Sequence, residues 1–312
     1  MSIVERAAGR LGTVAAAPAN SKRVRADLRE GSDIHEPHAG ERAIGTSRAH
    51  LAVPRAPSGR AVVGEGAAKT QEQPLQIDPR WMRSHNLITP ESGRTMIAED
   101  FRRIKRNLLA GALRPRVMVT SALPGEGKTF CAINLAISLA MELDRSVVLV
   151  DADTVRPSVL QGLGVEDGMR GLMDVLVEGG TVSDDLVRRT NIGKLSIVPS
   201  GTHRADATEL LASDKMRALV EDLSDRHRDQ IVIFDSPPLL VASESAALAG
   251  HMSQILMVVA AKQTTEVALK EALRRLDGCN CPVGLVLNKS EPNGIGYGYY
   301  GYGQGYGAAH GT

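Results

Sequence analysis

Aromatic residues are scarce in this chain of 312 residues, which contains one Trp, three Phe and five Tyr. None of them precedes Trp81, and residues 1–80 consist mainly of Ala, Arg, Gly, Pro and Ser without a sustained apolar period. Such a segment cannot bury enough apolar surface to offset the entropy of ordering it. We therefore expect residues 1–80 to be disordered. Residues 2–12 carry an amphipathic pattern that fits either a short docking helix or a frayed terminus.

Cysteines are also few, and neither sign of charge is in marked excess. The chain has three cysteines, Cys131, Cys279 and Cys281, an odd count with no metal-type spacing beyond one C-x-C, and a reducing compartment is the simplest expectation. His203 and His227 have no matching ligands nearby in the sequence. A net charge of +1, with no stripe of Lys and Arg, argues against nucleic acid as a partner.

Long apolar runs are missing as well, since none approaches the roughly 20 residues that span a bilayer, and the start of the chain does not have the pattern of a signal peptide. We expect a cytoplasmic protein that a partner recruits to the inner membrane.

Six short apolar runs recur along the second part of the chain. They cover residues 117–120, 147–150, 195–198, 231–234, 255–259 and 283–287. Each is rich in Val, Ile or Leu and lacks alternation, which is typical of strands covered on both faces. Helix-length segments separate most of the runs, and an amphipathic helix at residues 97–108 precedes them. We predict one α/β domain at residues 90–293, a mostly parallel sheet with helices on both faces.

A glycine-bearing loop follows the first predicted strand. It reads Ser-Ala-Leu-Pro-Gly-Glu-Gly-Lys-Thr over residues 121–129, and a helix is expected from Ala132 to Leu143. A loop of this kind at a helix N-terminus can cradle phosphates with its backbone N–H groups. Ala122 stands where the strict Walker A pattern has its first glycine. The residues predicted to bind the nucleotide here are Pro124, Gly125, Glu126, Gly127, Lys128, Thr129 and Phe130.

Carboxylates follow two further strands. Asp151 and Asp153 come directly after the second apolar run, and Asp235 follows the fourth. The carboxyl ends of parallel strands meet at one edge of the sheet, so these acids should face the phosphate loop. Thr129, Asp153 and Asp235 are the predicted Mg²⁺ ligands, because this ion prefers oxygen donors. For Asp151 or Asp153, capping of a helix that begins near residue 157 is an alternative role.

All five tyrosines lie close to the end of the chain, separated by glycine, in residues 294–312. They are Tyr297, Tyr299, Tyr300, Tyr302 and Tyr306. This segment is rich in glycine and poor in aliphatic residues, so it cannot bury enough apolar surface to offset the entropy of ordering it. We expect a flexible and accessible strand. Beside a phosphate-binding loop, it reads as the substrate of a self-phosphorylating enzyme. A low-complexity tail for weak association is the alternative.

The three motifs and the tail together resemble the bacterial tyrosine kinases of exopolysaccharide and capsule loci, in the stand-alone form of the exosortase (PEP-CTERM)-associated autokinases. The resemblance spans residues 90–306. It implies the P-loop NTPase fold of the septum-site and partition ATPase-like branch, with ATP and Mg²⁺ as cofactors. It also implies protein-tyrosine autophosphorylation of the tail, transferred between subunits, in the regulation of exopolysaccharide polymerisation and export.

The resemblance assigns further roles to individual residues. Lys128, Asp151, Asp153 and Asp235 would be catalytic, with Asp151 as the base for the incoming phenol and Asp153 assisting at the metal, or with these two roles exchanged, and Asn288 would contact the nucleotide base. Glu99, Arg102 and Lys105 match an oligomerisation motif through which such kinases form rings. The implied partners are a membrane activator of the chain-length-determinant type, acting in trans, and a tyrosine phosphatase. No nucleic acid is implied.

Two residues depart from the family pattern: Val155, and Lys105, which replaces the more common second arginine of the oligomerisation motif. Val155 occupies the position of the family's arginine, which leaves room for a binding module without catalysis. A P-loop ATPase switch of the septum-site or partition type is the main alternative. Those proteins carry a signature lysine early in the loop, where this chain has Leu123.

Overall fold

The computed structural model describes residues 73–93, 95–110, 115–179, 182, 185–227 and 229–290. The chain divides into two units, Met1–Thr70 and Gln71–Thr312, and every described residue belongs to the second. The amphipathic pattern at residues 2–12 and the five tyrosines lie outside the described residues. Within the described part, no helix combines the length and the apolar composition needed to cross a bilayer.

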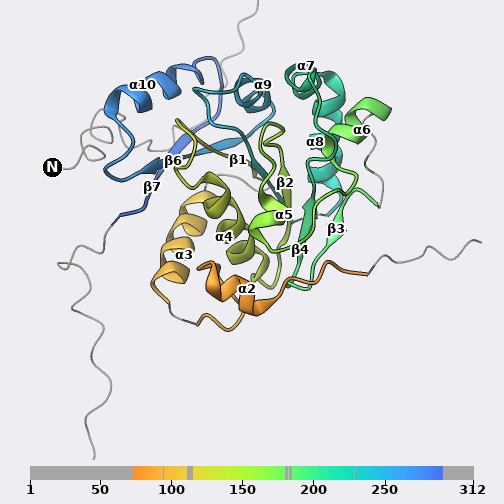
Figure 1. The fold of residues 1–312 in the computed structure, drawn as a ribbon, viewed down its shortest axis with the longest axis vertical. Coiled ribbons are helices and arrows are strands. Elements are labelled where there is room, and N and C mark those ends of the chain that lie inside the picture. Colours follow the sequence, from red (N-terminus) through yellow and green to blue (C-terminus); the bar gives the residue numbers. More distant parts are fainter. Residues whose placement is uncertain are drawn as a thin grey trace, which may run out of the picture. The chain divides into compact units, whose positions relative to one another are not determined.

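Seven strands of the described chain form one sheet in the order β3-β4-β2-β5-β1-β6-β7 (Figure 1). Their bounds are β1 Arg116–Ser121, β2 Ser146–Asp151, β3 Arg188–Arg189, β4 Leu195–Val198, β5 Gln230–Asp235, β6 Gln254–Ala260 and β7 Val283–Asn288. The six strands predicted from the apolar runs are all present and pair in parallel. The antiparallel edge strand β3 was missed, because two arginines carry no strand pattern.

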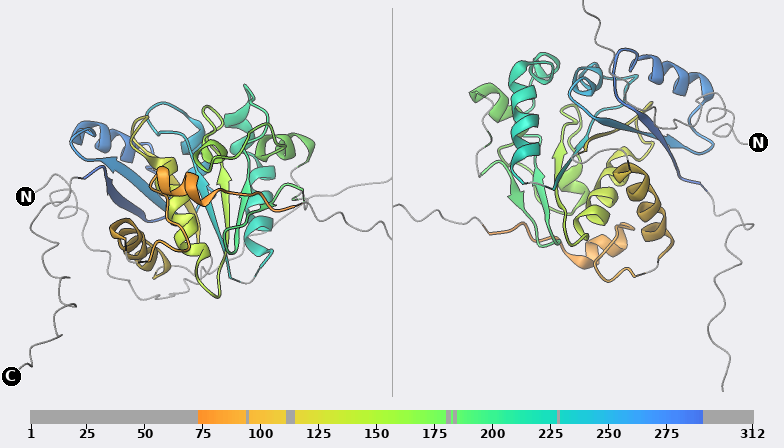
Figure 2. Two further views of the ribbon diagram at one scale, coloured as in Figure 1. Left: turned by 60° about the horizontal axis from the view of Figure 1, so that its bottom comes forward. Right: turned by 180° about the vertical axis from the view of Figure 1, so that it is seen from behind.

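Helices cover both faces of the sheet (Figure 2). One face packs against α2 Pro79–Ser84, α3 Met96–Leu109, α4 Lys128–Ala140 and α5 Val159–Gly162. The other packs against α6 Leu172–Glu178, α7 Ala207–Leu211, α8 Asp214–Asp225, α9 Glu244–Ala249 and α10 Glu266–Arg274. The strand residues divide between the two hydrophobic cores by alternation, so the central strands are buried on both sides. This is why their sequences lack alternation.

The helix after the phosphate loop lies in the middle of one layer, and ten of its residues are buried. It begins at Lys128 and ends at Ala140, earlier at both ends than the predicted span from Ala132 to Leu143. The exposed residues Met141 and Leu143 belong to a turn that leads into β2. Their apolar character extended the sequence pattern beyond the end of the helix.

The register of the central strands brings the functional residues to one edge of the sheet. Asp151 at the end of β2 pairs with Asp235 at the end of β5, and Asp235 also lies opposite Val119 in β1. The loop that follows β1 therefore starts beside both acids. Parallel pairing places the two carboxylates side by side although 84 residues separate them in sequence.

Candidate active site

The phosphate loop joins β1 to the N-terminus of α4. Gly125 and Gly127 adopt left-handed backbone angles, with φ of 78° and 95°, which side chains other than glycine rarely tolerate. A Cβ atom at Gly127 would lie 2.1 Å from Nδ2 of Asn288, so a side chain here would displace that amide from the loop. The loop leads into a helix whose N–H groups and dipole favour an anion. Its shape fits the phosphates of a nucleotide.

Lys128 lies between two carboxylates at the mouth of this loop. Its Nζ is 2.7 Å from Oδ2 of Asp153 and 3.6 Å from Oδ1 of Asp235, and it donates a hydrogen bond to Oγ1 of Thr129 at 3.1 Å. Burial disfavours the ammonium, but the negative charges of Asp235 and Asp153 outweigh it and raise the pKa of Lys128. The side chain is therefore a firmly charged cation beside the cradle.

Thr129 and Asp235 provide the oxygen donors expected for Mg²⁺. The hydroxyl of Thr129 donates to Oδ2 of Asp235 at 2.7 Å. The other oxygen of Asp235 is fully buried and has no hydrogen-bond partner among the described residues. Burial is the main reason why the pKa of Asp235 rises to about 6. The buried oxygen, Oδ1, faces the ammonium of Lys128 at 3.6 Å, which is an ion pair but too long for a hydrogen bond, so it can still bind a cation or accept from the cation's bound water.

The described residues do not form a complete metal cage by themselves, because no group of three His, Cys, Asp or Glu side chains is arranged to hold an ion. This agrees with the chemistry of Mg²⁺, which usually takes one or two protein ligands and completes its shell with water and phosphate oxygens. The donors Thr129 and Asp235, with Asp153 nearby, therefore fit a magnesium–nucleotide complex.

Asp151 is turned towards the backbone of the segment that follows it. One of its oxygens accepts hydrogen bonds from the N–H groups of Ser158 and Val159, both at 2.9 Å, and the other accepts from the N–H of Asp153 at 3.2 Å. Asp151 thus binds the N–H groups at the start of α5, whose N-cap residue is Ser158. Burial, followed by the charge of Asp235, raises its pKa to about 7. The carboxylate that contacts Lys128 is that of Asp153.

Glu126 lies within the phosphate loop, but its side chain is buried and points away from the cradle. One carboxylate oxygen accepts from the N–H of Leu123 at 2.8 Å, and the other accepts from the hydroxyl of Thr264. Glu126 can therefore contribute only its backbone to phosphate binding. The ring of Phe130 packs edge-on against Phe101 in the hydrophobic layer, so Phe130 likewise offers only backbone to the site.

The end of β7 lies against the outer side of the phosphate loop. Asn288 donates from Nδ2 to the carbonyl of Glu126 at 2.9 Å, and Lys289 donates from Nζ to the carbonyl of Gly125 at 2.7 Å. The sequence predicts a nucleotide contact for Asn288, but it does not predict that Lys289 and Thr264 bind the phosphate loop. A lysine directly after a strand-end asparagine is a weak signal, and Thr264 has no signal in the sequence beyond its place after β6.

Glu99, Arg102 and Lys105, the proposed oligomerisation residues, lie on α3. Glu99 and Arg102 pair with each other one turn apart and are partly exposed. Lys105 is turned inwards and binds the carbonyl of Ser138 at 3.3 Å and the carboxylate of Glu142. The structure therefore leaves Glu99 and Arg102 accessible, whereas the ammonium of Lys105 fastens α3 to the end of α4.

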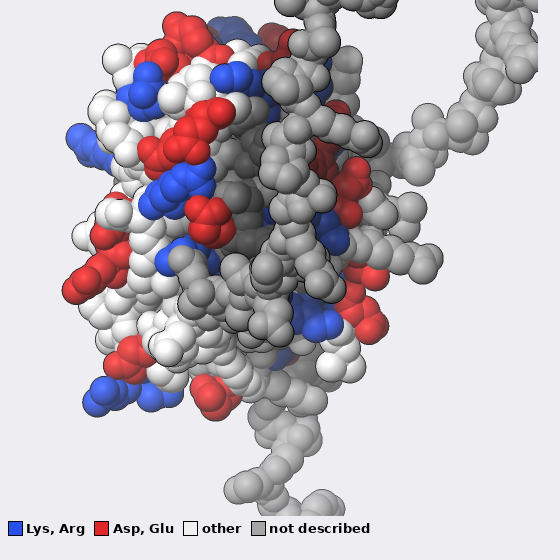
Figure 3. Space-filling model, turned by 90° about the vertical axis from the view of Figure 1, so that its right-hand side faces the viewer, with Lys and Arg blue, Asp and Glu red and all other residues white. Residues whose placement is uncertain are grey.

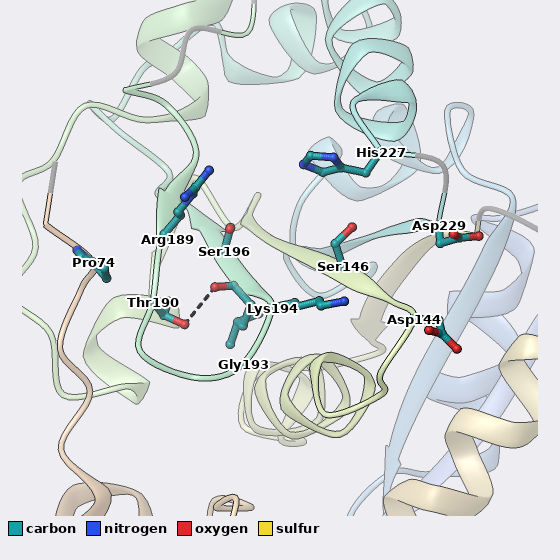
Figure 4. Close-up of a pocket in the computed structure, with 11 residues that line it drawn as sticks. Pro74, Asp144, Ser146, Arg189, Thr190, Gly193, Lys194, Ser196, His227 and Asp229 are labelled. Atoms are coloured by element: carbon teal, nitrogen blue, oxygen red, sulfur yellow. Dashed lines mark hydrogen bonds between the residues drawn. The ribbon is translucent and has the colours of Figure 1, made fainter. Parts of the chain in front are cut away.

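A cleft lies at the amino ends of the strands, at the opposite edge of the sheet from these acids. It has a volume of about 510 Å³, lies at the amino ends of β2 and β4, and is bordered by Ser146, Ser196, Arg189 and His227 (Figure 4). Ligands of parallel sheets bind beyond the carboxyl ends of the strands, which is the opposite edge. The chemistry of the acids and of the phosphate loop, rather than the size of this cleft, identifies the site.

Basic and acidic side chains are interspersed on the face drawn in Figure 3. Many surface charges are paired locally, such as Arg170 with Asp185 at 2.8 Å and Arg204 with Asp206 at 2.7 Å. On the part of that face where described residues are visible, neither sign dominates, which gives a polyanion no broad basic field.

The loop that carries Asp153 is held by a histidine from another part of the chain. His203, which follows β4, places Nδ1 2.8 Å from the carbonyl of Thr154. Because a carbonyl only accepts, Nδ1 must carry the proton. The loop of His203 is itself fixed by Asp174, which accepts from the N–H of Thr202 at 3.3 Å. His203 therefore supports the backbone next to Asp153 without contacting the site itself.

Comparison with known proteins supports the fold and the motifs. A family model described as an AAA domain matches residues 117–277, just over half of the chain. Tyrosine-protein kinase YwqD of Bacillus subtilis is 29% identical over 221 residues, which cover 69% of this chain and 91% of YwqD. EpsB of Ralstonia nicotianae, also named as a tyrosine-protein kinase, is 33% identical over 184 residues, which cover 59% of this chain but only 24% of EpsB.

Among solved structures, the VpsO kinase domain is 30% identical to the chain, with a TM-score of 0.55, and the match covers 62% of this chain and 95% of that domain. The phosphate loop, the acids at the ends of β2 and β5 and the seven-stranded sheet are therefore features of a kinase-type P-loop domain. The chain belongs to the AAA domain family, and within it to the bacterial tyrosine-protein kinases.

Proposed function

We propose that this protein is an ATP- and Mg²⁺-dependent protein-tyrosine kinase that phosphorylates its own C-terminal tyrosine cluster. The observation that carries the proposal is the contact of Lys128 with Asp153 and Asp235 at the mouth of a preformed phosphate loop. Phosphoryl transfer requires mainly positioning and charge neutralisation, and this cluster supplies both. The five tyrosines at residues 297–306 are the acceptors that the chain itself offers.

The residues divide the work of the transfer. The backbone of Gly125 to Thr129 binds the phosphates, and Lys128 neutralises charge on the transferred group. Thr129 and Asp235 would hold Mg²⁺, which would neutralise charge on the phosphate oxygens. Asp153 is the carboxylate placed to orient the phenol or accept its proton, whose ordinary pKa of about 10 makes such help useful. Asp151 keeps the loop of Asp153 in place.

The tail is phosphorylated between subunits in this proposal. Glu99 and Arg102 on α3 take part in the contact between neighbouring copies, with Lys105 bracing the helix. Self-association would place one subunit's tail at the site of the next. Each added phosphate brings about −1.5 to −2 charges, which would loosen the assembly. A membrane activator of the chain-length-determinant type and a tyrosine phosphatase would complete the cycle, at the inner membrane and in exopolysaccharide polymerisation and export.

Mass spectrometry of the tail peptide tests the proposal directly. The purified chain is incubated with ATP and Mg²⁺, with and without a candidate activator, and phosphotyrosine is expected among Tyr297, Tyr299, Tyr300, Tyr302 and Tyr306. Transfer between subunits is tested by mixing a Lys128→Ala chain that keeps its tail with an active chain that lacks residues 294–312. Phosphate on the Lys128→Ala chain is the expected result. ATP hydrolysis without any tail phosphate would instead favour a P-loop ATPase switch.

Substitution of His203 should slow turnover without weakening ATP binding. In His203→Ala, the carbonyl of Thr154 loses its donor, so Asp153 is held less firmly while the phosphate loop is untouched. A hydrogen bond of this kind is worth about 1 kcal/mol, so we expect kcat to fall roughly fivefold with the KM for ATP unchanged. His203→Asn should recover part of the rate. His227→Ala, in the remote cleft of Figure 4, is the matched control. An equal rise of KM in His203→Ala would argue against this role.

A further inference from the structure

Two strand ends hold the phosphate loop from its outer side. Lys289, directly after β7, donates to the carbonyl of Gly125, and Gln263, after β6, accepts a second hydrogen bond from the same ammonium at 3.1 Å. Lys289 does this from a left-handed backbone conformation with φ of 56°, which is uncommon for a residue with a side chain. Asn288 adds the hydrogen bond to the carbonyl of Glu126.

The buried carboxylate of Glu126 links the first part of the phosphate loop to the turn that follows β6. Thr264 donates its hydroxyl proton to one oxygen of Glu126 and accepts a hydrogen bond from the N–H of Ala260 at 2.9 Å. The second oxygen of Glu126 holds the N–H of Leu123. Glu126 is only 3% exposed, so a lost partner would leave a buried carboxylate oxygen without its hydrogen bond.

Apart from the N–H of Leu123, the groups of the loop engaged by these contacts are two carbonyls and one acidic side chain, which would repel phosphate. Held outwards by donors from β6 and β7, they leave the backbone N–H groups free to face an anion. The loop lacks the first glycine of the usual pattern, since Ala122 occupies that position. Its shape therefore depends on support from outside as well as on Gly125 and Gly127. A phosphate loop that already has its binding shape loses little conformational entropy when the nucleotide binds, which favours affinity.

We propose that Thr264 and Lys289 are positioning residues for nucleotide binding, which keep the phosphate loop in its binding shape without touching the nucleotide. The inference rests on the nucleotide site of the proposed function and adds two residues to it. Both act through the loop: Thr264 through the side chain of Glu126, and Lys289 through the carbonyl of Gly125.

Two adjacent threonines provide a sharp test. Thr264→Val removes the hydroxyl while keeping the size of the side chain, and we expect the Kd for ATP with Mg²⁺ to rise roughly tenfold. Thr265→Val removes an equivalent hydroxyl that only caps α10 through the N–H of Ala268. It should lower the Tm by about 3 °C and leave the Kd unchanged. Binding is measured by displacement of a fluorescent ATP analogue, which requires no phosphate transfer.

Conservative variants separate positioning from a general loss of structure. Thr264→Ser keeps the hydroxyl and should bind ATP within about twofold of the parent, while kcat at saturating ATP in Thr264→Val should also stay within about twofold. Lys289→Met should weaken ATP binding roughly fivefold, against no change for the exposed Lys270→Met. If Thr264→Val and Lys289→Met both bind ATP with parental affinity, this inference is wrong, while the proposed function still stands. A parent chain without measurable affinity for ATP would overturn the proposed function as well.

Discussion

Replacement of Lys128 by methionine should abolish phosphate transfer to tyrosine, with a loss of at least about a thousandfold in rate. The ammonium is the cation of the cluster that contacts both Asp153 and Asp235, and methionine keeps the apolar stem while removing the charge. Without it, the transferred group would face two carboxylates with no protein cation between them. The measurement is phosphotyrosine per chain over time, at saturating ATP and Mg²⁺. Lys270→Met, an exposed change on α10, should leave the rate unchanged.

The same substitution should also weaken the nucleotide-free fold. The side chain of Lys128 is 12% exposed, and that of Asp153 only 4%, so the variant leaves two buried acids without their partner. Removing one member of a buried ion pair typically costs about 3 kcal/mol or more. Chemical denaturation of the nucleotide-free protein measures this. A variant that keeps more than a tenth of the parental rate would contradict the role given to Lys128.

The sequence allowed the sheet and the positions of its acids to be predicted, because the information is local. Uninterrupted runs of Val, Ile and Leu mark buried parallel strands, and the rule that ligands bind beyond the carboxyl ends of such strands places Asp151, Asp153 and Asp235 together. The structure adds the register that sets Asp151 opposite Asp235. Strand β3 escaped prediction because two arginines at an edge pair through their backbone alone.

The division of roles between Asp151 and Asp153 could not be predicted from their spacing. Two residues apart at the end of a strand, either carboxylate could have faced the phosphate loop. The backbone of the following turn decides, since it presents the N–H groups of Ser158 and Val159 to Asp151. Asp153 is left to contact Lys128.

The supports of the site were also invisible in the sequence, because they are long-range pairs of ordinary residues. Thr264 reaches Glu126 across 138 positions, Lys289 reaches Gly125 across 164, and His203 reaches Thr154 across 49. None of these residues belongs to a motif with fixed spacing. Only the folded sheet brings the turns after β4, β6 and β7 to the edge where the phosphate loop lies.

Asp235→Asn should raise the Mg²⁺ concentration needed for activity and lower phosphate transfer by about a hundredfold to a thousandfold. One oxygen of the carboxylate accepts from the hydroxyl of Thr129, and the other is buried 3.6 Å from the ammonium of Lys128 without a hydrogen bond, so the second oxygen is the one that could also meet the ion. An amide keeps the size of the group but is a far weaker ligand for a hard cation. The measurements are initial rates against Mg²⁺ concentration and ATP affinity with and without the ion.

The nucleotide-free Asp235→Asn protein should be no less stable than its parent, because Lys128 keeps Asp153 as its nearer partner while the change removes a buried charge that repels Asp151 and Asp153. Burial already raises the pKa of Asp235 to about 6, which means that its ionised form is disfavoured in this environment. Catalysis and stability should therefore change in opposite senses, as expected when an acid is kept for its chemistry rather than for the fold. Asp214→Asn, at the exposed start of α8, controls for a general effect of charge. Parental rates in Asp235→Asn at saturating Mg²⁺ would show that the ion is held elsewhere.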